Sequence, residues 1–206
     1  HLRTPLVALL VALAAAGCFS VDAGAPSVNG CKLKPNTQCE DKDLSGEDLV
    51  QANLLNAQMA GVDVSDADMT QAQLTNADFT GANLSQTTLV QATLDNTIFD
   101  EADLRGAEMT QVSSNNTRFR EADLRGNDLS NISFLNGDFR DAKLASADLS
   151  GATLQNADLR GADLTGADLS DANLLNADLT GAKLAGADLT GANTQNAVGL
   201  PPATPG

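Results

Sequence analysis

An apolar residue recurs at every fifth position of this chain from Leu44 to Leu189, without a single insertion or deletion. Of these 30 central positions, 29 hold Leu, Phe, Met or Val, and the exception is Ser114. Ala stands two residues before the central residue in 20 of the 30 units, and Asp or Glu stands between the two in 16 units. The unit therefore reads Ala-Asp-Leu followed by two further residues, as in residues 162–166.

A period of five excludes both common regular elements. Residues five apart in an α-helix diverge by roughly 140°, so they form no apolar stripe. A straight strand alternates its faces with period two, so every second central residue would point outward. Ala and Leu can share the inner side of a short strand only if the next two residues turn the chain through a corner. Repeated corners of one sense make a coil, and stacked coils make a β-solenoid.

A second period, of twenty residues, gives the number of faces in each coil. Phe79, Phe99, Phe119 and Phe139 form an inward column at this spacing, and Gln51, Gln71, Gln91 and Gln111 form an outward one. Eight Asn residues form another outward column: Asn56, Asn76, Asn96, Asn116, Asn136, Asn156, Asn176 and Asn196. Twenty divided by five predicts four faces, with amide ladders at an inter-strand spacing of about 4.8 Å. Thirty units predict about 7.5 coils and a rod roughly 36 Å long at that spacing.

The central apolar residue and the Ala before it resemble the pentapeptide-repeat family over residues 42–198. The resemblance implies an all-β fold, a right-handed quadrilateral β-helix. Departures from the pattern gather in residues 112–138, where larger, polar or smaller residues replace Ala: Val112, Thr117, Asn127, Ile132 and Gly137. Phe134 lies one coil above Ser114 on the same face, so we expect its ring to fill the volume that Ser114 leaves empty.

Residues 1–17 have the layout of a secretory signal peptide, because Arg3 precedes a short apolar run and small residues then lead to Cys18. The run is too short to cross a bilayer as a helix, which needs about 20 residues. Residues 15–18 resemble a bacterial lipobox, which implies that Cys18 becomes the lipidated, palmitate-carrying first residue. Cleavage by ordinary signal peptidase remains the alternative.

The residue after Cys18 is Phe19 rather than Asp, and by the sorting rule known for bacterial lipoproteins this implies an outer-membrane lipoprotein. A periplasmic or secreted protein is the alternative. Residues 18–41 are expected to form a linker, and residues 199–206 a Pro-rich tail. Export makes a disulfide between Cys31 and Cys39 plausible, although free thiols or a metal site are alternatives. Two cysteines without nearby His make a poor metal site.

The chain contains 12 basic and 27 acidic residues, which gives a formal net charge of −15. This excess argues against a nucleic-acid binder, which needs a basic surface. The only histidine is His1, so most His-dependent catalysis is excluded. Carboxylate catalysis needs two acids in unlike surroundings within a cleft, whereas a regular convex rod places its acids in similar ones. We therefore predict no enzyme, no metal site and no cofactor.

A belt of mixed charge coincides with the irregular coils. Arg120, Arg140 and Arg160 stack at a spacing of 20, beside Glu101, Glu121 and Asp141, and Arg105 and Arg125 stack on another edge. Local neutralisation of an acidic rod explains such a belt more simply than recognition does. It is nevertheless the surface on which we would first look for a partner.

Three functions are compatible with these features. The first is a non-enzymatic exported scaffold, anchored through Cys18, monomeric or weakly dimeric, that presents a rigid acidic surface to an unidentified protein partner. The second follows from the resemblance alone: some pentapeptide-repeat proteins mimic DNA and bind DNA gyrase, but a signal peptide would remove this chain from the cytoplasm. The third, a carbohydrate-active β-helix enzyme, lacks a groove and is the weakest.

Overall fold

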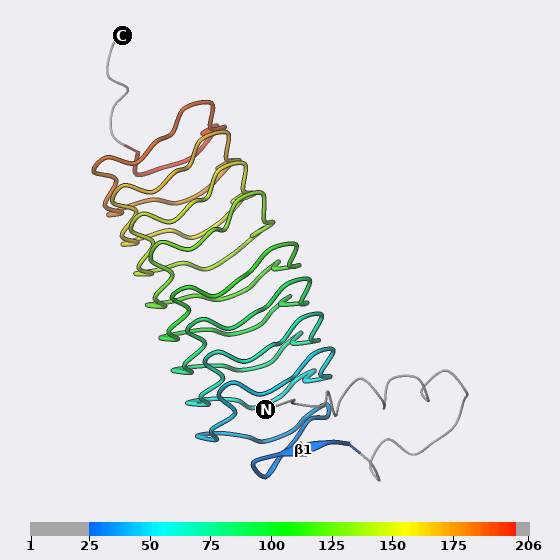
Figure 1. Cartoon of the computed structure of the whole chain (residues 1–206). Coiled ribbons are helices and arrows are strands. Elements are labelled where there is room, and N and C mark those ends of the chain that lie inside the picture. The colour runs from blue at the N-terminus through cyan, green and yellow to red at the C-terminus, as the bar shows by residue number, and fades with distance from the viewer. Residues whose placement is uncertain (1–24, 201–206) are drawn as a thin grey trace, which may run out of the picture.

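The computed structural model describes residues 25–200, which form one rod of stacked coils (Figure 1). Single-residue parallel bridges join outward positions 20 residues apart, from Gln38 with Gln58 to Asp178 with Val198, at every step but the one between Glu108 and Asp128. Between neighbouring coils the central N–H donates to a carbonyl 19 residues ahead, as from Leu164 to Lys183 at 2.9 Å. The predicted coil of 20 residues with four faces is therefore confirmed.

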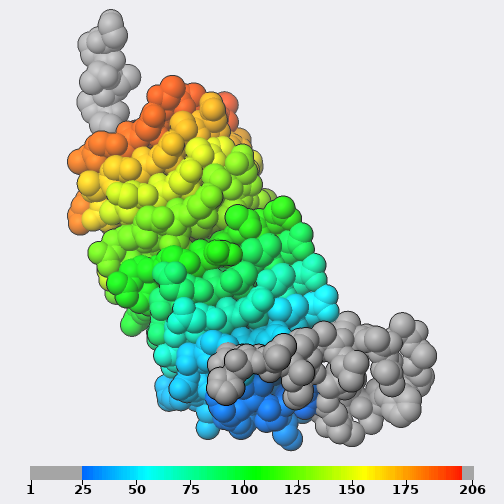
Figure 2. All heavy atoms as spheres, in the orientation of Figure 1, coloured from blue at the N-terminus to red at the C-terminus, as the bar shows by residue number. Residues whose placement is uncertain are grey.

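Alternation within each short strand places small and large apolar side chains in the core. Ala162 and Leu164 are fully buried, whereas Asp163 between them stays partly exposed. The Phe column stacks along the axis, with ring centroids of Phe79, Phe99, Phe119 and Phe139 separated by 5.5, 5.4 and 5.0 Å in turn. In Figure 2 the atoms of successive coils form parallel bands across the face in view, so the surface repeats coil by coil.

The corners of the coil explain why Gly and Asn recur two residues after the centre. The N–H of Ala167 donates to the carbonyl of Leu164 at 3.0 Å, and Gly166 between them has a φ of +67°. This is a type II turn, whose third residue needs the left-handed conformation that Gly and Asn adopt most easily. Gln occupies the same conformation at Gln71, with a φ of +58°. Its side chain donates to the amide oxygen of Gln91 at 2.8 Å, which adds an interaction that Gly cannot make.

The amide ladders form, but with interruptions. Asn56 donates to Asn36 at 3.2 Å and Asn76 donates to Asn56 at 3.0 Å. A second run joins Asn116 through to Asn196 at 2.9 to 3.0 Å per step. Within the part of the chain that is described, Asn96 makes no such bond to the Asn above or below it, so the predicted ladder is correct in two separate runs.

The ring of Phe134 packs into the irregular core one coil above Ser114. The fully buried Phe134 ring meets the rings of Phe119 and Phe139 edge to face, at centroid distances of 6.0 and 5.2 Å. Gly137 makes this possible, because a Cβ there would lie 2.8 Å from the Phe139 ring. The Ser114 hydroxyl is satisfied by Thr117 at 3.1 Å.

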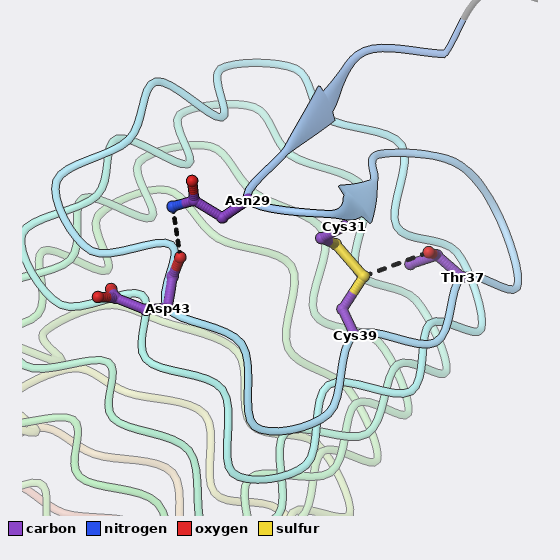
Figure 3. The surroundings of a disulfide bond; sticks show 5 residues. All are labelled: Asn29, Cys31, Thr37, Cys39 and Asp43. Carbon is purple, nitrogen blue, oxygen red and sulfur yellow. Dashed lines mark hydrogen bonds between the residues drawn. A yellow bond between two sulfur atoms is a disulfide. The ribbon is translucent and has the colours of Figure 1, made fainter.

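The N-terminal end of the rod carries a small hairpin. β1 (Ser27–Val28) pairs antiparallel with β2 (Cys31–Lys32), and a disulfide joins Cys31 to Cys39 with a Cα–Cα distance of 5.3 Å (Figure 3). Cys39 stands in a central position of a repeat unit whose outward residue is Gln38, so the coils begin before residue 42, the expected boundary. The sequence pattern missed this unit because Thr37 and Cys39 replace Ala and Leu. The signal-peptide, Cys18 and tail predictions lie outside the described residues, apart from the first two tail residues, Gly199 and Leu200.

Candidate functional site

The four faces of the rod differ in charge, and we name them by their outward columns. Face A carries Asp43, Asp63, Asn83, Asp103, Asp123, Lys143, Asp163 and Lys183. Face B carries Asp48, Asp68, Thr88, Glu108, Asp128, Asp148, Asp168 and Asp188. Face C carries Asn53, Gln73, Thr93, Ser113, Ser133, Thr153, Asn173 and Asn193. Face D carries Gln58, Asp78, Ile98, Arg118, Asp138, Asp158, Asp178 and Val198. Acids and bases thus mix on faces A and D, face C is uncharged, and face B is acidic without a base.

The arginines of the mixed-charge belt pair with these outward columns. On the edge between faces A and B, the guanidinium of Arg105 lies 2.5 Å from Asp103 and that of Arg125 lies 2.7 Å from Asp123. Both side chains are about half exposed, so such pairs contribute little net stability, about 0–1 kcal/mol each. Their contribution is to cancel charge on face A.

The second arginine stack lies on the edge between faces D and A. Arg120 contacts Asp138 at 2.6 Å, and Arg140 lies 2.9 Å from Asp138 and 3.5 Å from Asp158. Arg160 continues the row, at 2.5 Å from Asp158. The two arginine stacks therefore flank face A from its two edges.

The acids that stand beside this arginine stack in the sequence lie at the corners of the coil. Glu101, Glu121 and Asp141 occupy corner positions with φ between +57° and +60°. None of the three makes an ion pair with a described arginine. The coil instead brings each Arg of this stack against the outward Asp of its own unit or of the next coil.

The outward Asp has a structural role that the sequence reasoning missed. Its Oδ1 accepts the N–H of the residue two positions later, as from Ser45 to Asp43 at 3.0 Å and from Ser170 to Asp168 at 2.8 Å. A Ser or Thr hydroxyl at that position often donates to the same oxygen, as from Thr165 to Asp163 at 2.6 Å. These Asx turns satisfy the N–H that the corner would otherwise leave unpaired. The preference for Asp followed two residues later by Ser or Thr is the signal in the sequence.

These contacts lower the pKa of several carboxyl groups. The hydroxyl and the N–H of Thr165 hold the pKa of Asp163 below its usual value, and Thr180 does the same for the pKa of Asp178. At Asp138 burial opposes the shift, but the guanidinium groups of Arg140 and Arg120 outweigh it, so the pKa of Asp138 is also lowered.

We expect acid to destabilise the rod. A carboxyl group with a lowered pKa in the folded state contributes stability above its unfolded value, about pH 3.9, and loses it as the pH falls through the lower folded pKa. The melting temperature should therefore fall when the pH is lowered from about 6 to about 2.5, as followed by circular dichroism. A melting temperature that rose on acidification would show that repulsion along face B outweighs the Asx turns.

Residues 25–200 hold no group of three or more His, Cys, Asp or Glu side chains placed to bind a metal ion. In the same range no helix has the length and apolar character needed to cross a membrane. What the rod does offer is four rigid faces of distinct charge.

Comparisons with known proteins agree with this architecture. The family model described as "Pentapeptide repeats" matches eight copies, over residues 37–71, 72–111, 117–156 and 157–193. The comparison with curated proteins gave no match.

Several solved structures are similar in part. HetL from the cyanobacterium Nostoc, a pentapeptide repeat protein involved in heterocyst differentiation regulation, is 26% identical, with 81% of this chain and 89% of HetL covered and a TM-score of 0.30. Trypsin-treated QnrB1, a plasmid-mediated fluoroquinolone resistance protein, is 24% identical, covers 77% and 80% of the two chains, and has a TM-score of 0.47. A pentapeptide repeat protein from the Arabidopsis thaliana thylakoid lumen is 22% identical, covers 86% and 74%, and has a TM-score of 0.25.

The family match covers most of the chain and skips residues 112–116, the centre of the irregular coils. The family fold is the right-handed quadrilateral β-helix, in keeping with the four-sided coils described above. The chain belongs to the pentapeptide-repeat family.

Proposed function

We propose that this protein is a non-enzymatic, exported scaffold that is anchored to a membrane through Cys18 and presents a rigid, charged rod to a protein partner. Pentapeptide-repeat proteins are typically non-enzymatic structural or protein-binding proteins, which supports the scaffold role. The rod is already formed before binding, so little conformational entropy is lost when a partner docks.

The observation that carries export is the disulfide between Cys31 and Cys39. Both cysteines are fully buried, and the bridge ties the hairpin of β1 and β2 to the first coil. Disulfides persist in oxidising compartments and are rare in the cytosol. An export signal in residues 1–17 agrees with such a compartment.

Mimicry of DNA, the alternative, has weaker support. A DNA duplex carries phosphate charge along its whole length on both strands. Here face C has no charge in its outward column. The arginine stacks form ion pairs with acids of faces A and D and so reduce the negative charge of those faces. Face B alone is acidic without a base in its outward column, with Thr88 as its one neutral member.

Metabolic labelling with palmitate in a bacterial host tests the anchor. We expect the wild-type protein to take up label and the variant Cys18→Ser to take up none and to leave the membrane fraction. The double variant Cys31→Ser/Cys39→Ser is the matched control, since it removes two thiols but keeps Cys18, and it should remain labelled. An unlabelled wild-type protein found in the cytoplasm with its N-terminal segment intact would contradict export and anchoring.

A further inference from the structure

One junction between neighbouring coils lacks the bonds that join the others. On face B the parallel bridges run from Asp48 to Glu108 and resume at Asp128, but within the described residues no bridge joins Glu108 to Asp128. The main-chain N–H of Met69 donates to the next coil at 2.8 Å, whereas that of Met109, two coils further along the same face, makes no such bond. Figure 1 shows this junction as the widest gap between coils, where green meets yellow-green.

Three unusual inward side chains lie in the two coils that border the gap. Val112, Asn127 and Ile132 occupy inward positions where the unit normally has Ala, and all three are buried. The Asn127 side chain replaces a main-chain hydrogen bond between the coils. Its Oδ1 accepts the N–H of Gly106 at 2.9 Å, and its Nδ2 donates to the carbonyl of Leu104 at 2.8 Å. Elsewhere that corner N–H bonds to a main-chain carbonyl of the next coil.

The gap opens to the surface as a cleft of about 350 Å³, lined on one side by Ala107, Glu108 and Met109 and on the other by Asn127 and Asp128. Glu108 and Asp128 are exposed. Bridges from Asp103 to Asp123 and from Ser113 to Ser133 lie on the two faces that adjoin the cleft. A cleft of about 350 Å³ can admit one long side chain.

The cleft walls hold main-chain groups that are paired at every regular junction. The carbonyls of Ala107 and Asp128 are acceptors without a donor across the gap, and the N–H groups of Met109 and Gln111 are likewise without a carbonyl. Buried or half-buried main-chain groups are rarely left without a partner in folded proteins. A ligand with several N–H donors would satisfy the carbonyls.

The charge around the cleft indicates that such a ligand is positively charged. Within residues 25–200 no acid of the face B column takes part in an ion pair, in contrast to faces A and D. The arginines on the adjoining edge, Arg105 and Arg125, already form ion pairs with Asp103 and Asp123. The carboxylates of Glu108 and Asp128 thus present uncompensated negative charge on both sides of the opening.

We propose that this cleft is a receptor for one arginine side chain of a partner protein, an inference that deepens the scaffold function proposed above. A guanidinium group has five N–H donors in a planar fork, which matches a carboxylate on the rim together with carbonyls in the walls. The remaining acids of face B attract the basic surface around that arginine. Face B is then the docking face, and the cleft sets the register of the partner along a rod whose coils are otherwise alike.

Nuclear magnetic resonance titration of the isotopically labelled whole protein tests this inference. The probe is a five-residue peptide with one arginine between glycines, blocked at both ends, and the control probe has glutamine in place of arginine. We expect the arginine peptide to shift the amide signals of Met109, Gln111 and Asp128, and the glutamine peptide to leave them unchanged. Glu108→Gln/Asp128→Asn should weaken the affinity by at least roughly tenfold.

Two variants separate the cleft from general acidity. Asp148→Asn/Asp168→Asn removes the same charge from face B where the coils are bonded, so it should change the affinity by less than about threefold. Val112→Ala/Asn127→Ala/Ile132→Ala restores the usual residue at all three positions and keeps every charge. We expect it to fold, to close the cleft and to lose the local shifts.

Signal changes spread evenly along face B, with equal losses from both acid variants, would overturn the arginine receptor and leave only non-specific attraction. Absence of any shift with the arginine peptide would overturn it too. These results are independent of the palmitate experiment, because the titration measures binding and the labelling measures export.

Discussion

The variant Leu124→Asp should lose the folded state of the coils around residue 124. Leu124 is fully buried in the core of the rod. An unpaired carboxylate placed there has no cation to meet, and the cost of burying it reaches about 4 kcal/mol or more. In a solenoid each coil is stabilised mainly by its two neighbours, so the damage spreads along the axis.

Circular dichroism and limited proteolysis measure this effect. The variant should lose much of its β signal and be cut near residue 124, while the wild-type rod resists. Leu135→Asp is the matched control, because Leu135 lies at a corner, partly exposed, and the same change there should leave the fold intact. A well-folded Leu124→Asp protein would contradict the inward assignment of the central residue.

Phe119→Ala should be the most damaging of the neutral core changes. The Phe119 ring stacks between Phe99 at 5.4 Å and Phe139 at 5.0 Å and also meets the edge of Phe134 at 6.0 Å. Truncation leaves a cavity among three rings in the coil that already carries Ser114, so little can move in to fill it. We expect a loss of about 3–5 kcal/mol in the free energy of unfolding.

Urea denaturation measures the second effect, and Phe119→Leu provides the comparison. Leu159 and Leu179 occupy the same inward column in later coils, so the scaffold accepts Leu at this position. Phe119→Leu should therefore lose less than half as much as Phe119→Ala. Equal losses from both variants would show that the aromatic stack itself, rather than the filled volume, stabilises these coils.

Much of the fold could be predicted because the five-residue repeat determines the backbone conformation within each unit. Ala and Leu two residues apart must share a side of any extended segment, and Gly or Asn two residues later allows the left-handed corner. The period of 20 then follows from four such corners. The repeat unit around Gln38 was missed because Thr37 and Cys39 satisfy the same geometry with other side chains.

The candidate site was less predictable, because it depends on contacts between coils. The sequence placed Arg120, Arg140 and Arg160 beside corner acids, whereas the coil pairs the stack with Asp138 and Asp158. Val112, Asn127 and Ile132 depart from the usual Ala in the sequence. Whether the core accommodates such larger side chains or the two coils separate depends on the side chains of the neighbouring coils. That outcome is decided by packing density in three dimensions.

The sequence by itself therefore determined the path of one coil, the inward and outward directions and the columns that carry the charge, since each follows from the stereochemistry of a five-residue unit. Only the tertiary structure decided which charges cancel and which junction stays open. Ion pairs and ladder bonds join residues about 20 positions apart, and their formation depends on whether the side chains between two coils fit within one strand spacing of about 4.8 Å. Between Glu108 and Asp128 no bridge forms, and the cleft lies at that junction.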